Sequence, residues 1–300
     1  MYHFMEQISS NKAVLRMDVF GGPQRESIVE DDTFLNYRLA AVEVSSKITK
    51  EKADIIWNYD ASPKDIRFED GQLILDGFWE EGELNKIMVS MLANEMDLCG
   101  LHPFHSSSVF YRGKMILIVG GENNHGKSMT QLEGCVRGGK IFSTETTVTD
   151  EDGLCLYGSK HISITKRAKG TERSDVPDQD MGVKIFFGGY PEMPHYNDQC
   201  KVDLAIVPAI DGHFITQVKP LGTFEAAYQT FHSLMNFFGM SQLLEATVGL
   251  AMPIVDTPER RAKRALFTKK FVQDIPYYLI RSKSPQVLFD EIDKIIDAME

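Results

Sequence analysis

The stretch of sequence that decides the fold is KMILIVGGENNHGKSMTQLEG, residues 114–134. A run of apolar residues, 115–119, ends at a pair of glycines, four polar residues follow, and then come Gly126, Lys127 and Ser128. Apolar residues continue after Lys127 at helical spacing, up to the glycines at 138–139. This order predicts a buried strand, a tight loop and a helix.

The loop matches the phosphate-binding pattern G-x-x-x-x-G-K-[ST] in full, from Gly121 to Ser128. Glycines permit backbone angles that side chains forbid, so the loop amides can turn toward an anion, and the helix start adds its positive end. Lys127 would carry a point charge to the β- and γ-phosphates, and Ser128 suits magnesium. The predicted nucleotide-binding residues are Gly121, Glu122, Asn123, Asn124, His125, Gly126, Lys127, Ser128 and Met129.

Composition narrows the class of protein. The chain has 300 residues and a net charge of −11, which argues against nucleic acid as the main partner, because phosphate-backbone binding needs a basic face. The four cysteines are far apart without metal-ligand spacing, as is typical of reduced thiols in a cytosolic protein. No signal peptide and no apolar run of about 20 residues is present. We therefore expect a cytoplasmic protein without membrane segments.

The pattern along the chain predicts two domains. Residues 1–100 are expected to form a small α+β domain, with a hairpin that bends at Asp70-Gly71 and an amphipathic helix from about residue 81. Residues 101–300 alternate strands and helices and predict an α/β core. Residues 140–148 are expected to form one strand, and 154–158 the next.

The last quarter of the sequence predicts three helices. Phe231, Leu234, Met235 and Phe238 are spaced to share one helical face, and Thr257-Pro258 and Ser284-Pro285 have the form of N-caps followed by proline. The polar segment 166–182 is expected to be a loop and a candidate lid.

Residues 105–145 resemble the HPr kinase/phosphorylase family, which shares its P-loop fold with phosphoenolpyruvate carboxykinase. In that family a histidine opens a β-hairpin, the phosphate loop follows, and a helix and strand lead to two aspartates. Here HSSSVFYRGKMILIVGG fits the hairpin, and SMTQLEGCVRGGKIFSTE aligns without a gap. The tail DIPYYLIRSKSPQVLFDEIDKII is similar to the family's last strand and helix. The resemblance implies a mixed β-sheet with helices over residues 101–300.

The resemblance also implies roles for single residues. His105 matches the family histidine near the phosphates, and Lys127 and Ser128 match the phosphate and magnesium positions. Glu145 falls on the second acidic position, which in the family helps to hold magnesium, so Ser128 and Glu145 are the predicted metal ligands. Thr144 stands where the family has its catalytic aspartate, and threonine cannot accept a substrate proton at neutral pH. Substitutes for that base are His105, Glu145, Glu122 and His125.

These expectations lead to competing functions. The first is a magnesium-dependent kinase that transfers the γ-phosphoryl group of ATP, or of GTP, to a hydroxyl of a peptide, protein or small molecule, with His105, Lys127 and Glu145 as catalytic residues. The second is a nucleotide-binding regulatory or scaffold protein that kept the loop but lost the residue that accepts the substrate proton. A nucleotide hydrolase or a pyrophosphate-dependent transferase is a third. A homo-oligomer is compatible with each.

Two groups of cations could help to bind phosphate or an acidic partner. Lys166, Arg167, Lys169 and Arg173 lie in the expected lid, and ERRAKRALFTKK, residues 259–270, holds six cations. The alternative for both groups is a solvated charged surface.

Overall fold

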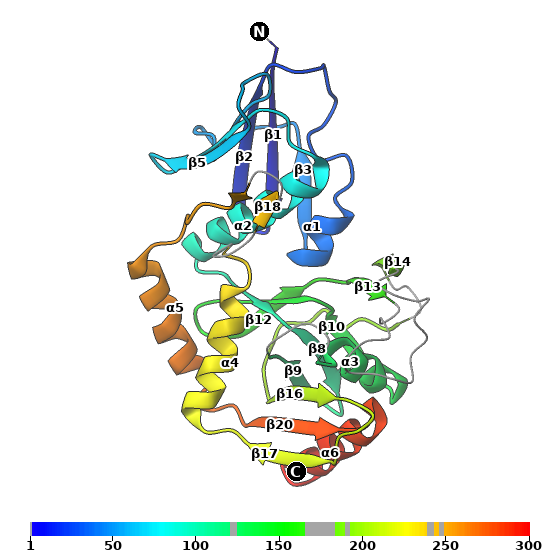
Figure 1. Cartoon of the computed structure of the whole chain (residues 1–300). Helices are drawn as coiled ribbons and strands as arrows, with labels where there is room; N and C mark the ends of the chain where they lie inside the picture. Colours follow the sequence, from blue (N-terminus) through cyan, green and yellow to red (C-terminus); the bar gives the residue numbers. More distant parts are fainter. Residues whose placement is uncertain (1, 121–124, 166–183, 190–192, 239–242, 246–248) are drawn as a thin grey trace. The chain divides into compact units, whose positions relative to one another are not determined.

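The computed structural model describes residues 2–120, 125–165, 184–189, 193–238, 243–245 and 249–300. The protein is mixed α/β, as the sequence predicts. Its residues group into two compact units (Figure 1): unit 1 holds residues 1–103 and 236–263, and unit 2 holds 104–235 and 264–300. The sequence analysis placed a division at residue 100 and did not separate 236–263 from the second domain.

Unit 1 is built on a six-stranded sheet in the order β3-β1-β2-β4-β6-β5. Alternate residues of β2 point to the buried face, as a half-buried strand requires. Helix α2 packs against β1 and β2, and a Glu80–Glu83 capping box closes its start. The elements of this unit are β1 (His3–Ser10), β2 (Ala13–Phe20), α1 (Thr33–Arg38), β3 (Val42–Ser45), β4 (Ile55–Asn58), β5 (Asp65–Glu69), β6 (Gln72–Asp76), α2 (Glu81–Leu98), β18 (Leu243–Glu245) and β19 (Leu250–Ala251).

The hairpin of β5 and β6 and the helix α2 confirm the sequence prediction for this region. Asp70 and Gly71 both have positive φ, which is the geometry of a two-residue hairpin turn.

Unit 2 contains a six-stranded sheet in the order β10-β8-β9-β16-β20-β17 and a four-stranded sheet in the order β15-β12-β11-β7. In the larger sheet β9, β16 and β20 are parallel, and β8 and β17 are antiparallel to their neighbours. The strands are β7 (His102–His105), β8 (Ser107–Tyr111), β9 (Lys114–Ile118), β10 (Lys140–Ser143), β11 (Thr146–Thr149), β12 (Leu154–Gly158), β13 (His161–Thr165), β14 (Lys184–Gly189), β15 (Cys200–Lys201), β16 (Leu204–Ile210), β17 (Gln217–Pro220) and β20 (Tyr277–Ser282).

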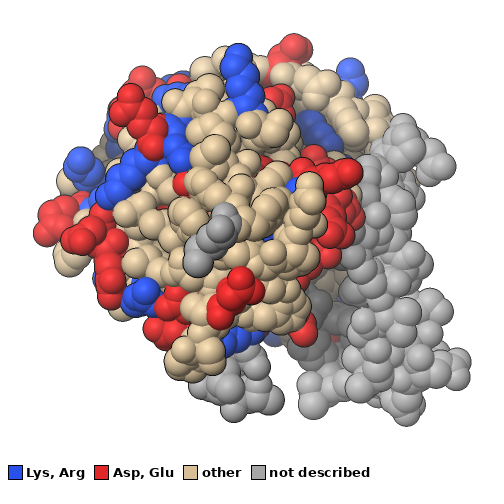
Figure 2. Space-filling view, turned by 90° about the horizontal axis from the view of Figure 1, so that it is seen from above, with Lys and Arg blue, Asp and Glu red and all other residues tan. Residues whose placement is uncertain are grey.

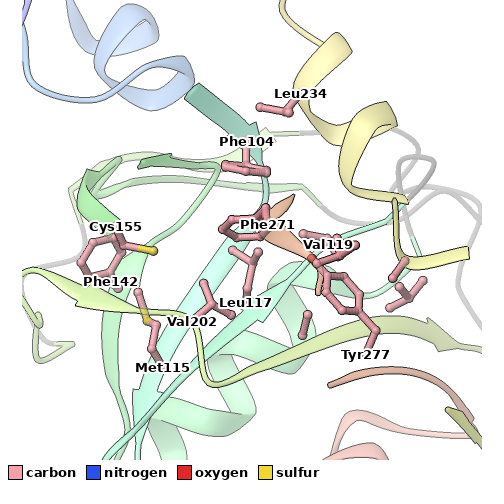
Figure 3. Packing of buried hydrophobic residues seen from close by; sticks show 14 residues of the cluster. Phe104, Met115, Leu117, Val119, Phe142, Cys155, Val202, Leu234, Phe271 and Tyr277 are labelled. Carbon is pink, nitrogen blue, oxygen red and sulfur yellow. The ribbon is translucent and has the colours of Figure 1, made fainter. Parts of the chain in front are cut away.

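Strand β9 is buried on both faces, which explains its continuous apolar run. Ile116 and Ile118 face a core formed with α3 (Lys127–Val136) and α6 (Pro285–Asp297), which lie on the same side of the sheet (Figure 1). Met115 and Leu117 face the opposite core, where Phe104, Phe271 and Tyr277 gather (Figure 3). Two further helices, α4 (Thr223–Met235) and α5 (Pro258–Phe271), contribute to this second core.

The helix starts predicted at the two prolines are confirmed. Ser284 Oγ accepts a hydrogen bond from Val287 N at the start of α6, and Thr257 Oγ1 accepts one from Arg260 N at the start of α5.

Two sequence predictions are wrong in detail. Residues 140–148 do not form one strand: the chain breaks at Thr144–Glu145 and passes from β10 in one sheet to β11 in the other. Helix α4 ends at Met235, so Phe238 lies beyond the helix that its spacing suggested. Phe238 is buried, but in unit 1.

No helix among the residues described is both long and apolar enough to cross a bilayer. The face in Figure 2 carries acidic and basic side chains around a largely uncharged centre, without a continuous basic surface among the coloured residues.

The contact between α3 and α6 gives a stability test. A Cβ at Gly134 in α3 would lie 2.8 Å from the Phe289 ring, whereas a Cβ at Gly82 in α2 would meet nothing within 4 Å. Gly134→Ala should therefore lower the free energy of unfolding by about 1–3 kcal/mol, because the buried ring must move. Gly82→Ala, the matched control, should be neutral or stabilising by up to about 1 kcal/mol. Urea unfolding followed by circular dichroism measures both, and equal effects would contradict the assigned packing.

Candidate functional site

Of the predicted phosphate loop, the structure describes residues 125–128 and Gly120, which precedes the loop; residues 121–124 lie outside the described residues. The loop follows β9 and leads into α3. Gly126 has φ +104°, and a Cβ there would lie 2.7 Å from Ile210 Cδ1, so a side chain would be strained and would clash. Ile210 N also donates to the His125 carbonyl at 3.2 Å. The end of the loop is thus seated on the carboxyl end of the parallel strand β16.

Lys127 is the first residue of α3 and is only 9% exposed. Its Nζ donates to the Gly120 carbonyl at 3.3 Å, so the ammonium ties the helix start to the far end of the loop. No Asp or Glu occurs in the first turn of α3. The ammonium group and the positive end of the helix are therefore next to each other, which favours an anion at this place.

The other described residues of the loop and helix start face solvent. His125 and Ser128 are exposed, and Met129 is 39% exposed. Gly121, Glu122, Asn123 and Asn124, predicted to bind nucleotide, lie outside the described residues.

His105 and Glu145 form a buried pair. His105 Nε2 lies 2.9 Å from Glu145 Oε1, and the two side chains are 7% and 13% exposed. A carboxylate can only accept, so the Nε2 hydrogen is donated to Glu145, and in the neutral form of the ring the lone pair is then on Nδ1. This arrangement orients an imidazole as a proton acceptor and stabilises the imidazolium that would form.

Backbone contacts hold both members of the pair. Ser106 N donates to the Glu145 carbonyl at 3.0 Å, and Glu145 N donates to Ser159 Oγ at 2.9 Å. Ser233 Oγ, from α4, donates to the His105 carbonyl at 2.8 Å. The positions of His105 and Glu145 are therefore fixed by residues from several segments of unit 2.

Strand pairing brings the His105–Glu145 pair to the loop. Ser107 of β8 is directly opposite Ile118 of β9. Because the strands are antiparallel, the residues just before Ser107 lie at the same end of the sheet as those just after Ile118. His105 is therefore at the end where β9 runs into Gly120, the residue whose carbonyl Lys127 contacts. The pairing therefore places His105, Glu145 and Lys127 at the same end of the sheet, where β9 ends.

The Thr144 hydroxyl is bonded to the backbone. The residue is 3% exposed, and its hydroxyl bonds to the Ser159 carbonyl at 3.1 Å and to the carbonyl of His161. These contacts use the hydroxyl for structure at the break between β10 and β11.

A cluster of buried hydroxyls lies on β8, β10 and β11, next to the site. The sequence analysis did not predict this cluster. Ser108, Ser143 and Thr147 bond to one another through their hydroxyls at 2.6–3.0 Å. Gln131, one turn after Lys127 in α3, donates to the backbone carbonyls of Ser108 and Ser143. The signal was the unusual run of serines and threonines in strands that otherwise read as core.

An aromatic cavity next to Gly120 was also missed. A Cβ at Gly120 would lie 2.7 Å from Val207 and 3.5 Å from Gln229 Oε1, and both residues line a cavity of about 200 Å³. Phe224 and Tyr228, on α4, line it too and are 82% and 60% exposed. Their spacing by four residues was the available signal.

Of the two predicted groups of cations, the structure describes only the second. Lys166, Arg167, Lys169 and Arg173 lie outside the described residues. In the basic run, Arg260 donates to Asn94 and Asp97, and Arg264 is 1% exposed. Those two cations therefore belong to the structure of α5 rather than to an open anion-binding face.

The predicted magnesium ligands are Ser128 and Glu145. Within the described ranges no cluster of three or more His, Cys, Asp or Glu could hold a metal ion by itself. Magnesium at nucleotides commonly takes one or two protein ligands together with phosphate oxygens and water, so an exposed hydroxyl fits this chemistry. Glu145 is engaged by His105, which makes Ser128 the better match for the metal.

No protein-family model matches this sequence, and no curated protein matches it.

Lys160 binds the backbone of β10, just before the break at Thr144–Glu145. Its Nζ donates to the carbonyls of Ile141, Phe142 and Tyr196 at 3.3, 2.5 and 3.0 Å. Burial lowers the pKa of Lys160 to about 8, and burial together with the Lys160 charge lowers the pKa of His195.

The lowered pKa of Lys160 predicts a pH dependence of stability. An unfolded lysine has a pKa of about 10.4, so between about pH 8 and 10 the unfolded chain binds more protons than the folded one at this position. The free energy of unfolding should then rise with pH, by on the order of 1–3 kcal/mol, relative to Lys160→Met, which cannot titrate. Urea unfolding of both proteins at several pH values measures the difference. A difference that stays constant over this range would contradict the lowered pKa.

Proposed function

We propose that the protein is an ATP-dependent kinase, with GTP as the alternative donor, that phosphorylates a hydroxyl group. We further propose that unit 2 is a P-loop core of the phosphoenolpyruvate carboxykinase and HPr kinase type. The observation that carries this proposal is the location of Lys127, at the start of α3, and of the His105–Glu145 pair at the same end of the sheet, where β9 ends.

The phosphates would bind at the start of α3. Lys127 offers an ammonium group, and the helix end offers backbone amides that are not used inside the helix. Ligands of open α/β sheets bind outside the carboxyl ends of parallel strands, which is where β9 and β16 end.

The nucleotide base would occupy the cavity next to Gly120. Its apolar lining and the exposed rings of Phe224 and Tyr228 suit the flat face of a purine. Ring stacking does not distinguish adenine from guanine, so the choice between ATP and GTP stays open in this proposal.

In the proposed reaction the acceptor oxygen attacks the γ-phosphorus, and the bond from the γ-phosphorus to the bridging oxygen breaks. ADP leaves with the electron pair of that bond. The acceptor proton passes to Nδ1 of His105, and Glu145 stabilises the resulting imidazolium. Magnesium, held by Ser128 together with phosphate oxygens, would supply neutralisation of the phosphate charge.

A second candidate is a nucleotide-binding regulatory protein without transfer activity. The observation in its favour is Thr144, whose hydroxyl is buried in backbone contacts where the resembling family has its base. In this case the His105–Glu145 pair would serve only to hold the break between the two sheets.

Calorimetry tests nucleotide binding and separates the phosphate and base sites. With magnesium present, Lys127→Met should weaken ATP and inorganic tripolyphosphate alike, by about 100-fold, because it removes a charge-assisted contact. Tyr228→Ala should weaken ATP by about 10-fold and leave tripolyphosphate unchanged, since base stacking is worth about 1–3 kcal/mol. Leu266→Ala, which trims an exposed side chain of α5 outside the cavity, is the control. Absence of ATP and GTP binding to the wild type would refute both candidate functions.

Turnover separates the kinase from the regulatory protein. If His105 is the base, His105→Gln should keep ATP affinity within about 3-fold and lower the rate of transfer by about 100-fold or more. Glu145→Gln should lower the rate less and alter its pH profile, because it acts through His105. Phosphorus NMR of ATP with a library of peptides and alcohols identifies the products. Intact binding with ATP left unchanged supports the regulatory protein, and formation of ADP and free phosphate without a phosphorylated acceptor indicates a hydrolase.

A further inference from the structure

Unit 1 contains an aromatic cavity that the proposed function does not use. It has a volume of about 630 Å³ and lies between residues 23–30 and the start of α2. Its lining includes Trp57, Tyr59, Phe78 and Trp79. A cavity of this size is in the range of sites that enclose a small organic group or a side chain.

The aromatic surface already holds one guanidinium group from the chain itself. Arg25 lies over the Trp57 ring at 4.8 Å and over the Tyr59 ring at 5.3 Å. Arg25 Nε is buried without a hydrogen-bond partner among the described residues, so the ring faces are its main counterpart. These two rings therefore bind a planar cation that the chain itself supplies, and Trp57, 2% exposed, contributes little open surface beyond it.

Further surface for a cation is open beside Arg25. Phe78 is 57% exposed, and its ring meets that of Tyr59 edge-on at 5.8 Å between centroids. Three exposed glutamates, Glu26, Glu30 and Glu81, share the lining with the one arginine. A neighbouring cavity that also borders on Phe78 is different, because its two lysines, Lys64 and Lys86, balance its two glutamates, Glu80 and Glu83.

We propose that this cavity binds an arginine side chain of a peptide. Aromatic faces and carboxylates together recognise a guanidinium, which stacks on rings and donates to carboxylates in one plane. The excess of carboxylates over cations in the lining disfavours an acidic or phosphorylated peptide. This inference stands apart from the proposed function, because it uses residues of unit 1 alone and requires no nucleotide.

The tryptophans make the site directly measurable. The chain has 2 tryptophans, and both line this cavity. We expect a saturable change in tryptophan fluorescence when the intact protein is titrated with the peptide acetyl-glycine-arginine-glycine-arginine-glycine-amide. The same peptide with citrulline in place of arginine keeps the shape of the side chain but removes its charge, and it should bind at least about 10-fold more weakly.

Two pairs of variants locate the binding. Phe78→Ala should weaken the arginine peptide by about 10-fold, while Leu98→Ala, which trims another exposed apolar side chain of unit 1, should change it less than about 2-fold. Glu81→Gln should weaken it by about 3-fold, while Glu43→Gln removes an equal charge outside the cavity and should have no effect. Circular dichroism confirms that each variant is folded.

The outcomes that overturn the proposal are equally definite. They are no fluorescence change at millimolar peptide, equal binding of the citrulline peptide, or Phe78→Ala binding like the wild type. Equal losses in Glu81→Gln and Glu43→Gln would show attraction to the overall negative charge only, and would also overturn it. None of these results depends on whether ATP binds, so the kinase proposal stands or fails separately.

Discussion

The pairing of β9 on both of its edges is the constraint on which the candidate site depends. On one edge β8 runs antiparallel, so the chain that precedes it delivers His105 to the end of β9. On the other edge β16 runs parallel, and two of its residues, Val207 and Ile210, pack closely against Gly120 and Gly126. Because β9 is buried on both faces, a shift of its register would move its side chains out of both cores. The register therefore fixes the positions of His105, Gly120 and Gly126 relative to one another.

The two breaks in the strands impose a second constraint. At Ser106 and at Thr144–Glu145 the chain leaves one sheet for the other, and peptide groups there lose their ladder partners. Side-chain hydroxyls replace those partners: Ser107 Oγ donates to the Thr144 carbonyl, and Ser159 Oγ accepts from the amides of Glu145 and Thr146. Buried hydrogen bonds of this kind restrict motion, which keeps Glu145 directed at His105.

The local sequence patterns correctly predict the helices and strands whose apolar residues are strongly periodic. The strand, loop and helix around Lys127, the hairpin at Asp70-Gly71, and the capped helix α6 all follow from residues close in sequence. The break at Thr144 could not be foreseen in that way, because its cause is a set of contacts to Ser107 and Ser159, which lie 37 and 15 residues away. Nor could spacing alone reveal that the helical periodicity of 231–238 continues past the end of α4.

The candidate site was predictable to a similar degree. His105, Lys127 and Glu145 came from the motif and the resemblance, but the contact between His105 and Glu145 is a property of the folded chain. Similarly, the cavity beside Gly120 combines residues from β16, β17, β20 and α4, which no short stretch of sequence contains.

A kinase and a nucleotide sensor would differ in the proton acceptor near the phosphates rather than in the phosphate loop. Both would use the ammonium group of Lys127 and the start of α3, where a buried cation next to a helix end favours an anionic ligand. Only the kinase also requires a proton acceptor close to the phosphates. Thr144 cannot serve, because a neutral hydroxyl already bonded to carbonyls has little basicity. An imidazole whose Nε2 hydrogen is held by a carboxylate has the required lone pair on its other nitrogen. A histidine paired with a carboxylate is therefore chemically sufficient as the proton acceptor, and a threonine at position 144 does not by itself rule out transfer.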